Sequence, residues 1–266
     1  MLINTIFASL LVTGSVSWLY YAHRLMEFPA GLLGVALGTI LLPSLAKYYN
    51  NNSTEEYSHL LDWGLRMTIM LTLPAALALA LLAIPLITTL FHHGAFTDHD
   101  AWMTREALIA YSIGLPGIIL VKVLAPGFYA RQNIRTPVKI AIITLLATQL
   151  MNLAFIIPFQ HAGLALAIGL GACINAGLLY YQLRSHDIYQ PQPGWLIFFL
   201  KIIVAVTVMG IVLWFATGSS ASWLLDSAMT RAGRLSLIIL AGASSYFAAL
   251  WLLGFRLHDF TKQQAI

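Results

Sequence analysis

A charged pair lies inside a long apolar stretch near the start of the chain. Arg24 and Glu27 are three residues apart within the stretch 16–47, so both fall on one face of a helix. A charge deep in a bilayer costs about 2.5–3.5 kcal/mol on insertion scales, so the pair should face protein or water. The planar guanidinium of Arg24 suits phosphate, and Glu27 would hold it in place. Tyr20, one turn earlier, and Gly31, one turn later, are further candidate ligand contacts.

Two other interpretations of this pair remain open. Arg24 and Glu27 would also satisfy each other as a purely structural buried pair, and Arg24 would snorkel to the interface if its span began near residue 24. The glycines that continue the same face, Gly31, Gly34 and Gly38, allow either a second helix or a ligand to approach the backbone closely.

Other polar side chains also lie within apolar stretches. Lys122 precedes Arg131 by nine residues, roughly 13 Å along a helix, so it is either a ligand contact or a lysine that snorkels toward the interface. His23 lies on a different face from its neighbour in the charged pair and titrates near neutral pH in water. Gln149 and Asn152 are predicted to form helix–helix hydrogen bonds.

Catalytic and metal-binding motifs are absent from the sequence. It contains no nucleophile elbow, Walker loop, HExxH or CxxC pattern. Its only cysteine, Cys173, lies in an apolar run and is predicted to be buried. We therefore expect no enzyme activity, no cofactor and no metal. An enzyme acting on a lipid-linked sugar remains the alternative of another class, and only one loop offers it acids and bases: His92, His93, Asp98, His99 and Asp100.

The composition requires a membrane. Hydrophobic residues make up 59% of the 266 residues and charged residues only 9%, against about 25% charged in soluble domains. Apolar runs at 16–47, 66–91, 107–129, 137–158, 163–183, 195–217 and 235–255 predict seven full spans, and residues 2–12 predict a half-span. The predicted fold is an all-α polytopic transmembrane bundle. Its N-terminal half-span resembles the end of a helix whose first part is missing.

Basic residues are concentrated in alternate loops. One set holds nine of them, from Lys47 to Lys262, and the other holds Arg105, Arg231 and Arg234. The positive-inside rule places the first set, and with it the C-terminus, in the cytoplasm. The basic residues form no single patch, so the net charge of +4 does not predict nucleic-acid binding. A stiff link at 189–194 separates the last two spans from the rest.

Two long stretches resemble a known family. Residues 3–47 and residues 122–140, KVLAPGFYARQNIRTPVKI, are similar to MurJ-type flippases of the multidrug/oligosaccharidyl-lipid/polysaccharide exporter superfamily. Shorter matches occur at 90–97, LFHHGAFT, and 191–195, PQPGW. The resemblance implies that residues 1–188 form the second lobe of a two-lobe flippase, without the first part of its first helix. It also implies that residues 189–266 add two helices, which form a groove for a lipid tail.

The resemblance also implies a function. The family translocates lipid II, the undecaprenyl-diphosphate-linked peptidoglycan precursor, across the bacterial inner membrane by alternating access. Arg24 matches the family's cavity arginine, which implies a diphosphate contact with Glu27 beside it. Lipid II and membrane lipids are therefore the expected partners.

Two departures from the family pattern qualify this expectation. His23 stands where the family usually has Asp, which puts in doubt any role for an acid there. The first lobe is absent, so we expect that the chain alone does not flip substrate and that a missing N-terminal lobe is a partner. A flippase for another polyprenyl-linked glycan and a non-transporting fragment or scaffold are the alternatives.

Overall fold

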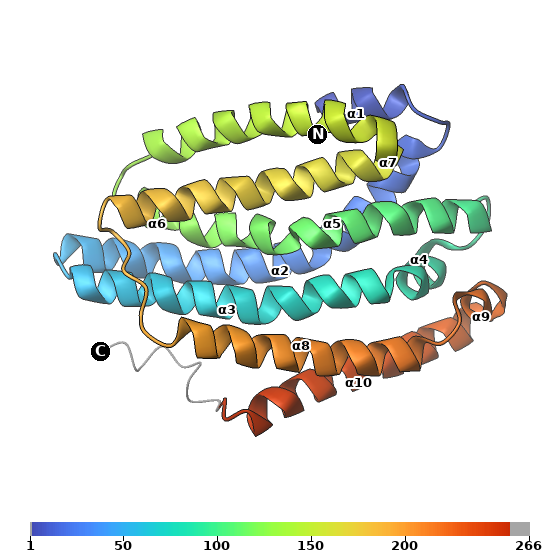
Figure 1. Ribbon diagram of the computed structural model, residues 1–266. Helices are drawn as coiled ribbons and strands as arrows, with labels where there is room; N and C mark the ends of the chain where they lie inside the picture. Colours follow the sequence, from blue (N-terminus) through green and yellow to red (C-terminus); the bar gives the residue numbers. More distant parts are fainter. Residues whose placement is uncertain (1, 256–266) are drawn as a thin grey trace.

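The computed structural model describes residues 2–255, and within that range the secondary structure is helical, with no strand (Figure 1). The helices are α1 (Leu2–Ser9), α2 (Ser15–Asn50), α3 (Thr54–Leu81), α4 (Ala83–Phe91), α5 (Asp98–Leu124), α6 (Pro126–Tyr129), α7 (Arg135–Ser185), α8 (Trp195–Thr217), α9 (Ser220–Leu225) and α10 (Ala228–Leu252). The long helices lie side by side as a bundle, which confirms the predicted fold class. The predicted position of the C-terminus falls outside the described residues.

The number of membrane crossings agrees with the prediction of about seven. Within residues 2–255, six helices are long and apolar enough to cross a bilayer. One of them, α7, has 51 residues, which at 1.5 Å per residue is about 77 Å, far more than the roughly 30 Å of hydrocarbon. Its backbone breaks at Gln160 (φ 48°, ψ −127°), and the two arms run back along each other (Figure 1). α7 therefore supplies two crossings, and α1 is the predicted half-span.

Two connections are shorter than the sequence suggested. Residues 48–65 and 92–106 were both expected to be loops, whereas α3 begins at Thr54 and α5 at Asp98. Glu55 lies in the first turn of α3, where the negative charge of a carboxylate interacts favourably with the helix dipole. At α5, Thr97 and Asp100 form a reciprocal capping box. Hydropathy missed these turns because polar residues at a helix start look like a loop.

Glycine allows the closest helix contact, between α5 and the second arm of α7. A Cβ atom on Gly114 would lie 2.0 Å from the Cα atom of Gly169, so the two backbones touch. One turn along, a Cβ on Gly117 would meet the backbone of Cys173. Cys173 itself is nevertheless exposed, so the prediction that it is buried is wrong. Small residues thus hold α5 at the centre of the bundle.

The last two long helices pack against one side of the bundle. α8 lies along α3, and α10 lies along α8 and α4 (Figure 1). The apolar cluster between them includes Met70 and Ile84 from α3 and α4, Ile202 and Met209 from α8, and Tyr246 from α10. This packing positions α8 and α10 against α3 and α4.

Candidate functional site

The predicted charged pair lies on an exposed face of α2. The Arg24 Nη1 atom is 3.2 Å from Glu27 Oε2, and the Arg24 Nε–H donates to the Tyr20 hydroxyl at 3.2 Å. The Arg24 and Glu27 side chains are 56% and 54% exposed. These partners all belong to α2, so the pair joins no two helices of the part that the structure describes. Within residues 2–255 the pair is therefore not buried, and its charges face outward from the helix bundle.

The three glycines on one face of α2, Gly31, Gly34 and Gly38, have different surroundings. The Lys122 side chain crosses from α5 and lies over Gly34, where a Cβ atom would be 2.3 Å from Lys122 Cδ. Gly38 faces the Lys122 backbone carbonyl. Gly31 has no atom within 4 Å of its would-be Cβ, so it is open. The crossing Lys122 side chain therefore explains Gly34, a side chain at Gly38 would meet only ordinary contact, and Gly31 keeps a free backbone surface.

Lys122 reaches across to α2 and does not extend along its own helix. Its Nζ donates a hydrogen bond of 2.9 Å to the Ala30 carbonyl. The ammonium is therefore held one turn from Glu27 along α2 and uses one of its three donors there. This geometry places Lys122 near the charged pair, while its stem fills the space above Gly34.

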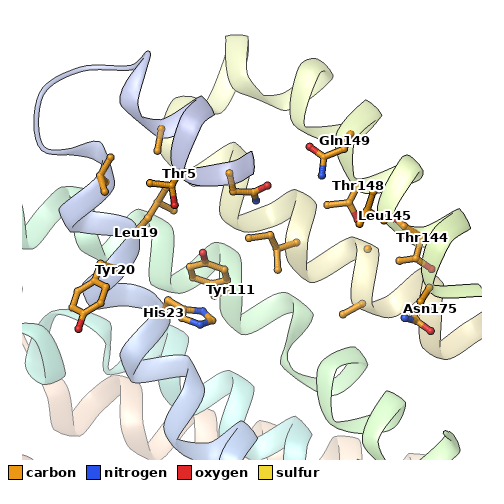
Figure 2. A pocket seen from close by; sticks show the side chains of 17 residues that line it. Thr5, Leu19, Tyr20, His23, Tyr111, Thr144, Leu145, Thr148, Gln149 and Asn175 are labelled. Carbon is orange, nitrogen blue, oxygen red and sulfur yellow. Dashed lines mark hydrogen bonds between the residues drawn. The ribbon is translucent and has the colours of Figure 1, made fainter. Parts of the chain in front are cut away.

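His23 faces a cavity and lies apart from the charged pair. The cavity has a volume of about 440 Å³ and lies between α1, α2, α5 and both arms of α7. Figure 2 shows His23 and Tyr111 on one side of it and Thr144, Thr148 and Gln149 on the other. The His23 ring lies 5.6 Å from the Tyr111 ring, and His23 Nδ1 has no hydrogen-bond partner. No acidic side chain lines this cavity among the described residues, but Glu27 lies one turn along α2 and is close enough to interact electrostatically with His23.

Tyr20 connects the cavity to the charged pair. It lines the cavity, its ring lies 5.1 Å from the Arg24 guanidinium carbon, and its hydroxyl accepts from Arg24. The predicted polar pair on α7 lies next to this region: Asn152 Nδ2 donates to Gln149 Oε1 and to Asn4 Oδ1 of α1. The expected helix–helix hydrogen bonding is therefore confirmed, with α1 as the partner helix.

The polar loop between α4 and α5 holds helix ends together. His92 Nε2 lies 2.8 Å from Asp98 Oδ1. Asp100 Oδ1 accepts from the Trp18 indole of α2 at 2.7 Å, and Asp100 Oδ2 accepts from Thr97. Within residues 2–255 no three His, Cys, Asp or Glu side chains gather in a metal-binding group. These acids and imidazoles thus have structural partners.

The sequence did not reveal that two charged side chains, Asp62 and Arg231, are buried. Asp62 lies between the predicted apolar runs 16–47 and 66–91, yet it belongs to α3 and only 3% of its surface is exposed. It bonds to Arg66, one turn along α3, and to the link between α7 and α8. The four-residue spacing of Asp62 and Arg66, opposite charges on one helix face, was the available signal.

The geometry can be compared with known proteins. A family model described as "Lipid II flippase MurJ" matches residues 1–232. The chain belongs to the MurJ family. A lipid II flippase MurJ of Burkholderia cenocepacia is 50% identical over 264 residues, which are 99% of this chain and 51% of the relative. A probable lipid II flippase MurJ of Haemophilus influenzae is 40% identical over 264 residues, covering 97% of this chain and 52% of the relative.

A solved MurJ structure has the same fold. The lipid II flippase MurJ in an inward closed conformation matches with a TM-score of 0.76 at 27% identity, covering 93% of this chain and 50% of that one. The expected family is therefore confirmed, and membership together with the apolar helices indicates a multi-pass inner-membrane protein. The chain spans about half the length of the curated MurJ relatives it matches.

Proposed function

We propose that this chain forms one wall of a lipid II flippase and that Arg24 contacts the diphosphate of the substrate. The observation that carries the proposal is the exposed ion pair within an apolar, membrane-length helix. Hydrocarbon does not stabilise two exposed charges, so this face of α2 meets water, ligand or another protein surface during function. A diphosphate-linked lipid satisfies a guanidinium through charge-assisted hydrogen bonds.

The neighbours of Arg24 keep it ready for an anion. Glu27 and Tyr20 hold the guanidinium through single contacts of 3.2 Å each, so it retains further N–H donors. Gly31 leaves the backbone open one turn beyond Glu27, where a large headgroup needs room. The Lys122 ammonium is bound to the Ala30 carbonyl one turn from Glu27, so we treat it as a structural group and not as a substrate contact.

The cavity beside Tyr20 suits the uncharged polar part of the substrate. Its lining offers hydroxyl and amide groups from Thr144, Thr148, Gln149 and Asn175. Such groups bind sugar hydroxyls and peptide amides. Tyr20 lines the same cavity and bonds to Arg24, so the cavity lies beside the arginine. The headgroup would pass along this surface while the prenyl chain stays in lipid. We place the lipid-tail unit at residues 189–266, because α8 and α10 present apolar side chains such as Leu200, Phe215 and Leu240 outward.

Transport by alternating access requires a second surface opposite α2. Within the described residues, the Arg24 pair faces away from the bundle, and the matched relatives are about twice as long. We propose that an N-terminal lobe supplies the facing wall and that the C-terminus lies in the cytoplasm. The test is a reconstituted flipping assay with lipid II on the chain alone and on the chain joined to a MurJ N-terminal lobe. Flipping by the joined protein only is expected. No flipping by a well-folded joined protein would contradict the proposal.

Substrate class is tested by competition in the same assay. Lipid II is expected to be flipped, and an excess of a polyprenyl-diphosphate glycan with a different sugar is expected to compete weakly. If the second glycan is flipped as well as lipid II, the protein is a general polyprenyl-glycan flippase.

Lys122→Met separates a structural lysine from a ligand contact. Methionine keeps an unbranched stem over Gly34 but removes the ammonium that binds the Ala30 carbonyl. We expect thermal stability to fall by about 1 kcal/mol, as for one hydrogen bond, and lipid II flipping to be largely retained. Thermal unfolding in detergent and the flipping assay on the joined protein measure both. Loss of flipping at unchanged stability would instead make Lys122 a substrate contact.

A further inference from the structure

We propose that Asp62 and Tyr246 are positioning residues that fix the α8–α10 pair to the α3–α4 helix, so that the two move together during transport. The inference rests on the proposed function for the role of α8 and α10 in holding the lipid tail. It is carried by polar contacts at three points along α3–α4, near its start, its middle and its end. Each point joins α3 or α4 to the chain that follows α7.

The first point is a buried carboxylate with four donors. Asp62 Oδ1 accepts from the Tyr189 hydroxyl at 2.6 Å, the Trp195 indole at 2.8 Å and the Gln192 backbone N–H at 3.1 Å. Asp62 Oδ2 accepts from Arg66 Nε at 2.7 Å. A carboxylate that is 3% exposed needs such partners, since an unpaired buried charge is strongly destabilising.

Arg66 completes this attachment from the same helix. Its Nη2 donates to the carbonyls of Gln192 and Pro193, and its guanidinium lies 4.9 Å from the Trp195 ring centre. Burial and the hydrogen bond to Asp62 raise the pKa of the Tyr189 phenol, so Tyr189 remains a donor across the physiological range. The link leading into α8 is thus bound to α3 through backbone N–H and carbonyl groups and through the Tyr189 side chain. The Trp195 side chain, at the start of α8, binds to the same carboxylate.

The second point lies at a proline in α3. Pro74 has no N–H, so the Met70 carbonyl lacks its helical donor. The Tyr246 hydroxyl of α10 donates to that carbonyl at 2.6 Å. Tyr246 is 2% exposed, so no water replaces it without rearrangement. α10 therefore satisfies the group that the proline leaves open, and it does so at the middle of the span.

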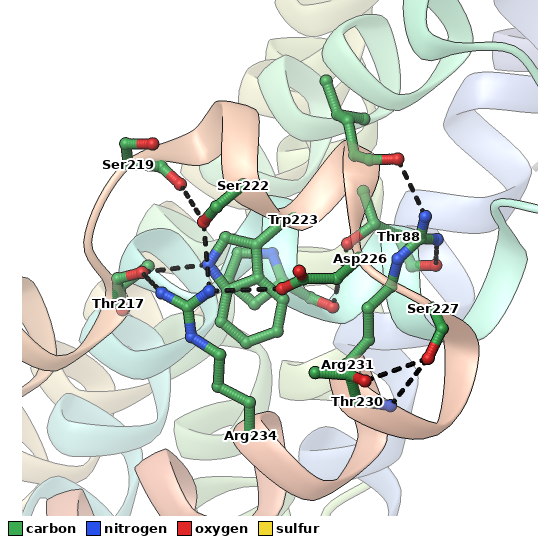
Figure 3. A network of polar contacts seen from close by, with 12 residues as sticks. Thr88, Thr217, Ser219, Ser222, Trp223, Asp226, Ser227, Thr230, Arg231 and Arg234 are labelled. Carbon is green, nitrogen blue, oxygen red and sulfur yellow. Dashed lines mark hydrogen bonds and ion pairs between the residues drawn. The ribbon is translucent and has the colours of Figure 1, made fainter.

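The third point is a buried arginine that binds two helix ends (Figure 3). Arg231 of α10 donates from Nη1 to the Thr88 carbonyl in the last turn of α4 at 2.9 Å, and from Nη2 to the Leu224 carbonyl of α9 at 2.9 Å. A cation at helix C-termini is favourable. Arg234 holds the adjoining α8–α9 turn through the Thr217 carbonyl and Asp226. Through Arg231, α9 is therefore attached both to α10 and to the end of α4.

The Asp62, Tyr246 and Arg231 contacts each reach α3 or α4. The apolar cluster between the two units likewise draws its buried residues from α3, α4 and the residues joining them, and from α8, α9 and α10. Contacts at three separated points prevent both sliding and rotation of one unit on the other. A displacement of α3–α4 in alternating access would therefore carry the α8–α10 pair with it.

Spin-label distances test the attachment directly in this chain. With Cys173→Ser as background, one label pair is placed on Glu55 of α3 and Ile197 of α8, and a reference pair on Glu55 and Ile143 of α7, all exposed positions. We expect Asp62→Ala to broaden the 55–197 distance distribution and to leave the 55–143 distribution narrow. Asp62→Asn keeps an oxygen acceptor but loses the charge facing Arg66, so it should broaden the first distribution less.

A matched control removes a buried polar contact elsewhere. Asn152→Ala breaks the α7–α1 hydrogen bond and should leave the 55–197 distribution narrow. The inference is overturned if Asp62→Ala leaves that distribution unchanged. If Asp62→Ala broadens both distance distributions, the double variant Asp62→Asn/Tyr246→Phe is measured next. Broadening of the 55–197 distribution alone supports the inference. Broadening of both distributions, or of neither, overturns it.

Transport gives a second readout on the joined protein. If α8 and α10 hold the lipid tail, Asp62→Ala should slow flipping of an undecaprenyl-linked substrate and change flipping of a short-prenyl analogue little. An equal loss for both substrates would contradict the positioning role. The label distances need no flipping activity, so failure of the proposed function and failure of this inference are distinguishable.

Discussion

Arg24→Ala in the joined two-lobe protein is expected to lower lipid II flipping by about one to two orders of magnitude while leaving the fold intact. The side chain is more than half exposed and bonds only within α2, so its removal opens no cavity in the lobe. A charge-assisted hydrogen bond contributes about 1.5–3 kcal/mol, so losing the diphosphate contact should weaken binding roughly 10- to 150-fold. Reconstituted flipping and thermal unfolding, measured on the same preparation, test both halves of the prediction.

Conservative variants refine this test. Arg24→Lys keeps a positive charge but loses the planar fork, so an intermediate rate is expected. Val35→Ala is the matched control, because Val35 is also an exposed side chain of α2, and its flipping should be normal. Full activity of Arg24→Ala would refute the diphosphate contact. Equal loss in the Val35→Ala control would show that α2 tolerates no change, and the role of Arg24 would then need a binding measurement with a soluble diphosphate.

Gly114→Val is expected to have the largest effect on stability. Even the Cβ atom would lie 2.0 Å from Gly169 Cα, and the obstacle is backbone that cannot rotate away. α5 and α7 would have to separate, and overpacking of this kind costs about 1–3 kcal/mol or more. We expect a lower midpoint of thermal unfolding in detergent and less folded protein in the membrane.

The second arm of α7 offers a matched control. A Cβ atom on Gly177 meets nothing within 4 Å, so Gly177→Ala should be neutral or stabilise the helix by about 0.5–1 kcal/mol. If Gly114→Val unfolds at the same temperature as the unsubstituted chain, the close α5–α7 contact is not present in the membrane-embedded protein.

Prediction from sequence was accurate for features that depend on a single helix. The seven apolar runs, the separate N-terminal half-span and the shared face of Arg24 and Glu27 follow from hydropathy and helical periodicity alone. It was less accurate at polar helix starts, where Thr54 and Asp98 begin helices that extend the spans. It also failed for Cys173, because the apolar surroundings of a membrane helix do not distinguish lipid from protein interior.

Composition and periodicity by themselves determined that this chain is a helical membrane protein with one charged stripe, and two motifs indicated its family. Only the tertiary structure decided which glycines meet α5, that Arg24 and Glu27 face outward, and that Asp62 is buried beneath a link more than a hundred residues away. The physical reason is the range of the interactions. Helix periodicity and transfer into lipid are local, whereas a buried carboxylate is stable only if distant donors converge on it.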